Sequence, residues 1–256
     1  MIHPQAIVDP TAKLADDVVV GPWTIIGPDV EIDAGSKIES HVVLKGPTKI
    51  GKNNHIFQFS SVGEDTPDLK YDGEPTRLVI GDNNVIREGV TIHRGTVQDR
   101  HETTIGDNNL LMAYAHVGHD CVLGNNIILV NNVALAGHVH VDDWAILGGY
   151  SGVHQFCRIG AHSFTGMYTS LTKDLPAYVT AFGTPGEAKT INAEGLRRRG
   201  FSKEAIAEIN RAFKTVYRRG LTLEDAKKQL AELAEKEPAV QVMLDSLNAS
   251  QRGITR

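Results

Sequence analysis

Aliphatic residues recur at every sixth position through most of the chain. The first run has no exception: Ile2, Val8, Leu14, Val20, Ile26, Ile32, Ile38, Leu44, Ile50, Ile56 and Val62. The phase resumes at Ile80, Ile86 and Ile92 and, after one slip, continues from Ile105 to Leu171 with a single failure at Thr165. An α-helix repeats every 3.6 residues and a β-strand every two, so neither element alone explains a period of six.

A second regularity accompanies the first. A small or β-branched residue stands four places after each aliphatic one, and glycine often follows the aliphatic residue directly, as in Val20-Gly21 and Ile50-Gly51. Short flat strands that meet at glycine-containing corners explain both features, with three hexads forming one triangular coil that bonds to the next at roughly 4.8 Å. Stacked coils bury a continuous aliphatic column. We therefore predict a mainly β protein, with a parallel β-helix of hexapeptide repeats over residues 1–190.

Two polar, turn-rich segments interrupt the hexads, at about residues 64–77 and 95–103. We expect both to be loops extruded from the β-helix. Loops that interrupt a regular scaffold often carry function, although a tolerated insertion is the alternative.

Residues 191–256 follow a helical pattern instead. Ser202 can cap a helix that ends near Gly220, and Thr222 with Asp225 resembles a capping box that opens a second helix, with Pro238 at its end. We do not expect a region this small to have a core of its own. We expect this C-terminal α-helical domain to pack on the β-helix or on a neighbouring subunit and to cover the open end of the sheets.

Composition narrows the classes of function. The formal net charge of −5 argues against a general nucleic-acid binder. The chain has no signal-peptide pattern and no apolar run of about 18 residues, so we expect a cytoplasmic protein that does not insert into a membrane. Cys121 and Cys157 occupy equivalent inward positions two coils apart, beyond the reach of a disulfide, and are expected to be packed thiols.

Candidate chemistry gathers on one part of the predicted surface, because positions 18 apart stack in successive coils. Asp120 stacks on His138, while Gly137 and Gln155 continue the column of His119. The full cluster comprises His116, His119, Asp120, His138, His154 and Gln155.

An imidazole beside a carboxylate can act as a general base, as the pair His119 and Asp120 would. The backbone N–H of Gly137 could stabilise a developing oxyanion. A hydrogen-bonded ladder of polar side chains on a solenoid face is the alternative. Clustered histidines can also bind zinc. However, carbonic anhydrases of this fold have two histidines five positions apart, and no two of the eleven here have that spacing. We predict no metal.

The segment from Asn192 to Gly220 is basic, with eight Lys or Arg against three Glu. Its run of Arg197, Arg198 and Arg199 could bind a diphosphate or help to dock an acidic carrier protein. From charge alone a solvated helix face is the favoured interpretation.

Nearly the whole chain resembles the acyl-carrier-protein-dependent UDP-N-acetylglucosamine O-acyltransferases of Gram-negative bacteria. The segments that carry the resemblance are VVLKGPTKIG, DLKYDGEPTR, VTIHRGTVQ, AHVGHDC, LAGHVHVDD, VHQFCRIGAHS and NAEGLRRRGFS. The resemblance implies a left-handed β-helix and a homotrimer with sites in clefts between neighbouring prisms. It also implies transfer of an (R)-3-hydroxyacyl group to the glucosamine 3-hydroxyl of UDP-N-acetylglucosamine, the first step of lipid A (lipopolysaccharide) synthesis. The donor would be a phosphopantetheine thioester on acyl carrier protein, with no further cofactor.

The resemblance also implies roles for residues. His119 would be the general base, Asp120 would orient it, and the amide of Gly137 would stabilise the oxyanion. Asp68 and Lys70, on the first loop, would hold the sugar nucleotide. The other implied substrate contacts are His116, His138, His154 and Gln155 in the cleft and Asn192, Glu194, Arg198 and Arg199 around UDP, which favours a binding role for the basic segment.

Met167 departs from the family pattern. Members that use chains of about fourteen carbons have glycine at this position, on the floor of the acyl groove, and a larger side chain there leaves less room. We predict a shorter acyl group, of around ten carbons, unless the flexible methionine swings aside.

Two alternatives stay open. The N-acyltransferase of the same pathway has a similar helical region but typically a separate N-terminal uridine-binding domain, whereas the hexads here begin at Ile2. A non-catalytic β-helical scaffold is the second, and it gives no purpose to Asp68, Lys70 or the His119–Asp120 pair.

Overall fold

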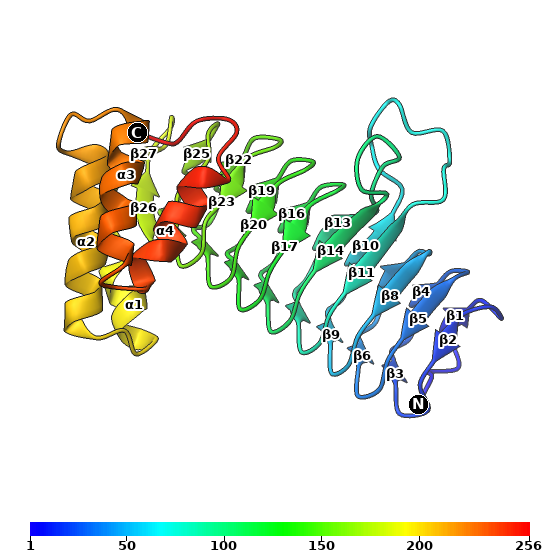
Figure 1. Ribbon diagram of the computed structural model, residues 1–256. Coiled ribbons are helices and arrows are strands. Elements are labelled where there is room, and N and C mark those ends of the chain that lie inside the picture. The colour runs from blue at the N-terminus through cyan, green and yellow to red at the C-terminus, as the bar shows by residue number, and fades with distance from the viewer.

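The computed structural model describes residues 1–256 as a three-sided rod, with the N-terminus at one end and four helices at the other (Figure 1). Almost every strand pairs in parallel with the third strand along the chain, so the strands form three long sheets. The register confirms the predicted coil of 18 residues: Val117 pairs with Leu135, which pairs with Val153. The predicted parallel β-helix is therefore confirmed.

We name the three faces sheet 1, sheet 2 and sheet 3, in the order in which the chain visits them. Sheet 1 comprises β1 (Ile7–Val8), β4 (Ile25–Ile26), β7 (Val43–Leu44), β10 (Ser61–Glu64), β13 (Thr91–His93), β16 (His116–Val117), β19 (Ala134–Leu135), β22 (Gly152–Val153) and β25 (Ser170–Leu171). Sheet 2 comprises β2 (Lys13–Leu14), β5 (Val30–Ile32), β8 (Thr48–Ile50), β11 (Arg77–Ile80), β14 (Glu102–Ile105), β17 (Val122–Leu123), β20 (His140–Val141) and β23 (Arg158–Ile159). Sheet 3 comprises β3 (Val19–Val20), β6 (Lys37–Ile38), β9 (His55–Ile56), β12 (Val85–Ile86), β15 (Leu110–Leu111), β18 (Ile128–Leu129), β21 (Ile146–Leu147), β24 (Phe164–Thr165), β26 (Val179–Phe182) and β27 (Glu187–Ile191).

The core is the aliphatic column that the hexads predict. In the two-residue strands from β3 onward the first side chain points outward and the second, such as Leu111 or Leu129, is buried in the rod. Thr165, the one failure of the pattern, also lies inside, where its hydroxyl accepts a hydrogen bond from the Gly148 N–H at 2.9 Å and contacts the Ser151 hydroxyl at 3.1 Å. A polar side chain is tolerated there because both partners are within the rod.

The corners turn through residues with positive φ, and many of them are not glycine. Asp120, His138 and Phe156 all adopt this left-handed conformation, with φ of 57°, 62° and 65°. They follow one another in successive coils at the edge where sheet 1 turns into sheet 2. This edge therefore brings residues that are distant in sequence into one column.

Both extruded loops leave the rod from that same edge. The first lies between β10 and β11 (residues 65–76) and the second between β13 and β14 (residues 94–101), and they project close together from the rod (Figure 1). Their limits are within two residues of the predicted segments.

The helical region covers the C-terminal end of the rod (Figure 1). It comprises α1 (Ala193–Arg198), α2 (Lys203–Tyr217), α3 (Leu223–Ala234) and α4 (Ala239–Asn248). The predicted caps are present: the Ala205 N–H donates to Ser202 Oγ at 3.0 Å and the Asp225 N–H to Thr222 Oγ1 at 3.1 Å. The helices share the core of the β-helix, and Tyr178 Oη donates to the carbonyl of Ala239 at 2.9 Å.

One part of the helical prediction is wrong. The helix after Thr222 ends at Ala234, and Pro238 is the N-cap of a fourth helix that we did not predict. Proline suits that position because the first residues of a helix need no N–H donor. None of the four helices combines the length and apolar character needed to cross a lipid bilayer.

The two cysteines are free and lie inside the rod, as predicted. Burial raises the pKa of the Cys121 thiol to about 12 and that of Cys157 to about 11. Both are therefore protonated packing residues rather than nucleophiles.

Candidate active site

The corner after β16 holds an imidazole against a fully buried carboxylate. His119 Nδ1 lies 2.8 Å from Asp120 Oδ2, and the side chain of Asp120 has no exposed surface. The backbone N–H of Thr96 donates to both carboxylate oxygens at 3.0 Å, and its hydroxyl donates at 2.6 Å. Burial alone would raise the pKa of Asp120, but hydrogen bonds from His119 and Thr96 outweigh it and hold the pKa below its usual value. The carboxylate is therefore ionised.

This arrangement fixes the tautomer of His119. Because Nδ1 donates its proton to Asp120, Nε2 carries the free lone pair. The ring lies over Gly137 of the next coil, where a Cβ built on the glycine would be 2.5 Å from both Nε2 and Cε1. The Gly137 N–H donates to no acceptor within the chain. A lone pair and an unoccupied backbone donor thus lie side by side.

A second imidazole–carboxylate pair stands beside the first. His138 Nδ1 lies 2.7 Å from Asp99 Oδ2, and its ring stacks on Phe156 with the centroids 4.3 Å apart. The ring meets that of His119 edge to face at 4.9 Å. The second loop therefore contacts both pairs, through Thr96 on Asp120 and through Asp99 on His138.

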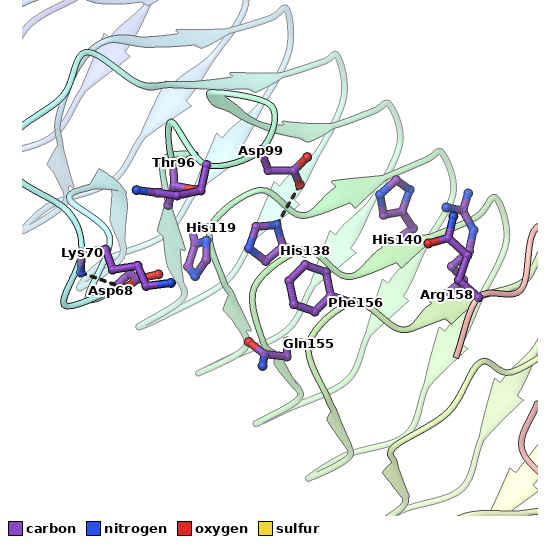
Figure 2. Close-up of a pocket in the computed structure, with 12 residues that line it drawn as sticks. Asp68, Lys70, Thr96, Asp99, His119, His138, His140, Gln155, Phe156 and Arg158 are labelled. Atoms are coloured by element: carbon purple, nitrogen blue, oxygen red, sulfur yellow. Dashed lines mark hydrogen bonds and ion pairs between the residues drawn. The ribbon is translucent and has the colours of Figure 1, made fainter. Parts of the chain in front are cut away.

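These side chains open onto a cavity of about 530 Å³ at the edge between sheet 1 and sheet 2 (Figure 2). The cavity is lined by Asp68, Lys70, Thr96, Gln98, Asp99, His119, His138, His140, Gln155, Phe156, Arg158 and Gln251. We call it the histidine cavity. Asp68 and Lys70 extend from the first loop toward His119 (Figure 2).

The first loop is anchored by a buried arginine. Arg94 is only 5% exposed, and its guanidinium donates to the carbonyl of Gly63, the carboxylate of Asp65 and the hydroxyl of Tyr71. Asp65 and Tyr71 both belong to the loop that carries Asp68 and Lys70. Arg94, the first residue of the second loop, therefore fixes the position of the first loop.

A second cavity, of about 640 Å³, lies on sheet 3 beside the short helix α1. We call it the arginine cavity, and its walls are Ile146, Phe164, Thr180, Thr190, Ile191, Asn192, Ala193, Glu194, Gly195, Arg197, Arg198 and Arg199. Asn192 caps the helix, since its Oδ1 accepts from the Gly195 N–H at 3.0 Å. Sheet 3 is the face opposite the edge between sheets 1 and 2, so the two cavities lie on opposite sides of one rod.

One group of side chains has the composition of a metal site. One ligand atom from each of His119, Asp120 and His138 lies within 4.8 Å of the others. The Nδ1 atoms of both histidines already make hydrogen bonds to carboxylates, which metal binding would have to replace. The absence of a metal stays a prediction.

Comparison with known proteins identifies the family of the chain. A family model described as the second domain of UDP-N-acetylglucosamine O-acyltransferase matches residues 174–255, and the hexapeptide model of bacterial transferases matches residues 11–46 and 102–137. The acyl-[acyl-carrier-protein]–UDP-N-acetylglucosamine O-acyltransferase of Stutzerimonas stutzeri is 70% identical over 256 residues, which cover 100% of this chain and 99% of that protein. The chain belongs to this family of acyltransferases.

Solved structures of the same family match the chain in sequence and in fold. LpxA from Acinetobacter baumannii is 52% identical to this acyltransferase with a TM-score of 0.98, over 100% of this chain and 99% of that one. The UDP-N-acetylglucosamine acyltransferase of Francisella novicida is 44% identical, also with a TM-score of 0.98, over 100% and 94% of the two chains. The predicted left-handed parallel β-helix is thereby confirmed.

The structure divides the predicted site residues of this acyltransferase into groups. Asp68, Lys70, His119, His138 and Gln155 line the histidine cavity, with Asp120 and Gly137 directly behind His119. A separate group lines the arginine cavity, namely Asn192, Glu194, Arg198 and Arg199.

Besides Asp120 and Gly137, three predicted residues line neither cavity. His116 points outward from sheet 1, with Nδ1 2.7 Å from Thr91 Oγ1, and burial, followed by the nearby His93, lowers its pKa to about 4. His154 is exposed, with Nδ1 3.1 Å from the carbonyl of Gln155. Met167 is 61% exposed at the corner between sheet 3 and sheet 1. Within one chain these three are not gathered with the other predicted residues.

Sequence reasoning missed several residues of the histidine cavity. Phe156 stacks one coil from His138, and Arg158 pairs in register with His140, so the 18-residue rule could have located them. Thr96, Gln98 and Asp99 lie on an irregular loop, and Gln251 lies near the C-terminus. No periodicity places those four.

Proposed function

We propose that this acyltransferase transfers an (R)-3-hydroxyacyl group from acyl carrier protein to the 3-hydroxyl of UDP-N-acetylglucosamine, as the opening step of lipid A synthesis. The observation that carries the proposal is the His119–Asp120 pair, whose free Nε2 faces a cavity beside an unused backbone donor. The names of relatives up to 72% identical over their whole length support the choice of donor and acceptor.

The proposed chemistry uses only side chains and backbone of the protein. His119 Nε2 takes the proton of the sugar hydroxyl as its oxygen attacks the thioester carbonyl. The Gly137 N–H donates to the resulting oxyanion, and the ionised Asp120 stabilises the imidazolium. Collapse of the tetrahedral intermediate breaks the C–S bond, and the phosphopantetheine sulfur leaves with the proton that His119 held. The cycle returns His119 to its neutral form and requires no metal or redox cofactor.

We further propose that the active form is a homotrimer whose sites are shared between neighbours. On one chain the histidine and arginine cavities face opposite sides of the rod, too far around it for a single substrate to reach both. A parallel neighbouring rod would bring its arginine cavity against the histidine cavity. His116 and His154 lie on the sheet 1 side of the same edge, where such a neighbour would enclose them.

Met167 supports a preference for an acyl chain of around ten carbons. Its side chain is largely exposed within the chain and is available to occupy part of a cleft at the corner between sheets 3 and 1. Filling a cleft with a side chain shortens the ligand that fits there. Met167→Gly should therefore shift the preference toward chains of about fourteen carbons.

The test is incubation of the protein with UDP-N-acetylglucosamine and a panel of (R)-3-hydroxyacyl thioesters on acyl carrier protein, with the product identified by mass. We expect an ester product that is formed fastest with the ten-carbon donor and is absent with His119→Ala. Acylation only of an acceptor with a free 2-amino group would identify the N-acyltransferase instead. Full activity of a folded His119→Ala variant would refute the assigned base.

A further inference from the structure

His162 joins the arginine cavity to the β-helix at two points. It occupies the corner between β23 and β24, with φ of 58°. Its backbone carbonyl accepts a hydrogen bond from Asn192 Nδ2 at 3.0 Å, and its ring Nδ1 lies 3.1 Å from Arg199 Nη1. Asn192 and Arg199 are the N-cap and C-cap of α1, so one residue of the rod holds both ends of that helix.

The ring of His162 is held by aromatic neighbours. It lies nearly parallel to Trp144, with an interplanar angle of 6°, and to Tyr178, at 22°, while Phe201 meets it edge to face with the centroids 5.2 Å apart. The Arg199 guanidinium lies over the same Trp144, 5.0 Å from its centroid. The imidazole has little freedom to move away from Arg199.

Arg199 differs from the two arginines before it. Arg197 and Arg198 both pair with Glu194, whereas no carboxylate lies within 4.0 Å of Arg199. Burial lowers the pKa of Arg199, yet an arginine stays charged in proteins. A partly buried guanidinium without an acidic partner is suited to an anionic ligand, and one hydrogen bond to His162 leaves its other N–H donors available.

We propose that His162 is a positioning residue: its neutral imidazole accepts a hydrogen bond from Arg199 and holds the guanidinium toward a phosphate group of the nucleotide. The inference rests on the proposed function in that it takes a nucleoside diphosphate as the ligand of the arginine cavity.

The charge state of His162 follows from its surroundings. Burial first, and then the positive charge of Arg199, lower its pKa to about 4, against a smaller opposing effect of Asp143. The ring is therefore neutral near pH 7, and an Nδ1 that faces a guanidinium N–H must be the acceptor, with the proton on Nε2. A protonated ring at this position would repel Arg199 instead.

His162→Phe tests the proposal. Phenylalanine adopts the same left-handed conformation at Phe59 and Phe156, which lie at the other two edges of the rod, with φ of 66° and 65°, so the backbone and the aromatic stacking can be kept while the acceptor is removed. We expect the KM for UDP-N-acetylglucosamine to rise about tenfold, as for the loss of a hydrogen bond to a charged group, with little change in kcat.

Two further variants separate positioning from folding. His162→Asn places an amide oxygen close to the position of Nδ1, and asparagine already occupies this corner in other coils at Asn108 and Asn126, so KM should return toward the wild-type value. His41→Phe is the matched control, because His41 has the same conformation and stacks between Trp23 and Phe59 far from both cavities. It should leave KM unchanged.

Binding of UDP alone, measured by titration calorimetry, separates this inference from the proposed reaction. We expect wild type to bind UDP and His162→Phe to bind it about tenfold more weakly. In an Arg199→Ala background the His162→Phe change should have no further effect. If wild type binds UDP with this pattern but transfers no acyl group, the reaction is wrong and the inference stands. Equal UDP affinity of wild type and His162→Phe would overturn the inference. So would a loss of UDP affinity on His162→Phe that is as large in the Arg199→Ala background as in wild type.

Discussion

At the scale of single residues, the imidazole of His119, which we propose as the base, is positioned by contacts from three coils. Asp120 holds Nδ1, Thr96 and the buried surroundings keep Asp120 ionised, and the absence of a side chain at Gly137 leaves room for the ring. Glycine is needed at position 137 for this close approach and not for its backbone angle, because its φ is not positive.

Gly137→Ala should displace His119 without unfolding the rod. An added Cβ would stand 2.5 Å from the ring, so the ring must move while the backbone N–H at position 137 is kept. We expect kcat to fall by about 100-fold, as for other small displacements of a catalytic group, with a nearly unchanged melting temperature. Gly152→Ala is the control, since a Cβ there meets nothing within 4 Å. Retained activity in Gly137→Ala would show that the position of the ring is not critical.

Two packed histidines should make the stability of the protein depend on pH. Burial lowers the pKa values of His116 and His162 to about 4 in the folded chain, against 6.5 when exposed. Between these pH values the unfolded chain binds more protons than the folded chain. The contribution of the two neutral histidines to the free energy of unfolding is therefore fully present above pH 6.5. It is lost as the pH falls toward 4, by at most about 1.4 kcal/mol per pH unit and group.

The measurement is the melting temperature at pH 7.5 and pH 5. His116→Gln cannot be protonated, so its melting temperature should fall less than that of wild type between the two conditions. His41→Gln, at an exposed corner, should behave as wild type. Identical pH dependence in all three proteins would contradict the assignment to His116.

At the scale of elements, the strands and helices that could be predicted were those with a regular or local signal in the sequence. The six-residue period located the strands and the column of His119, and the caps at Ser202 and Thr222 located two helices, because each signal is local in sequence. The fourth helix was missed because Pro238 was interpreted only as a stop. The contacts of Thr96 and Asp99 were missed because a loop without a repeat has no register from which its position follows.

Arg94→Met should release the first loop. The substitution keeps an unbranched side chain but removes the donors to Gly63, Asp65 and Tyr71, so Asp68 and Lys70 lose their fixed position. We expect kcat/KM to fall by about ten- to 100-fold and residues 65–76 to become sensitive to limited proteolysis. Arg77→Met removes an exposed ion pair with Glu102 at the end of the same loop and should have little effect. If residues 65–76 of Arg94→Met resist protease as well as those of wild type, Arg94 does not anchor the first loop.

At the scale of the whole molecule, a triangular rod places its chemistry on separate sides. The edge between sheets 1 and 2 carries His119, and the opposite face carries the arginines beside α1. A rod stiffened by three continuous sheets cannot fold these two surfaces onto each other. Only a second rod beside the first can combine them, and a closed ring of three identical contacts would give every chain one complete site.

Shared sites predict complementation between two inactive variants. His119→Ala and Arg199→Ala should each be inactive or nearly so, but a mixed trimer always contains one interface at which an intact His119 meets an intact Arg199. With equal, random assembly about three quarters of the trimers are mixed, so about one quarter of wild-type activity should return on co-expression. Co-expression of His119→Ala with Asp68→Ala is the matched control. His119 and Asp68 line the same histidine cavity and come from the same chain. Every chain of a mixed trimer therefore has one of the two defects in its own histidine cavity, so no site is intact and activity should stay low. Recovery in the control, or none in the first pair although mixed trimers are isolated, would place the whole site on a single chain.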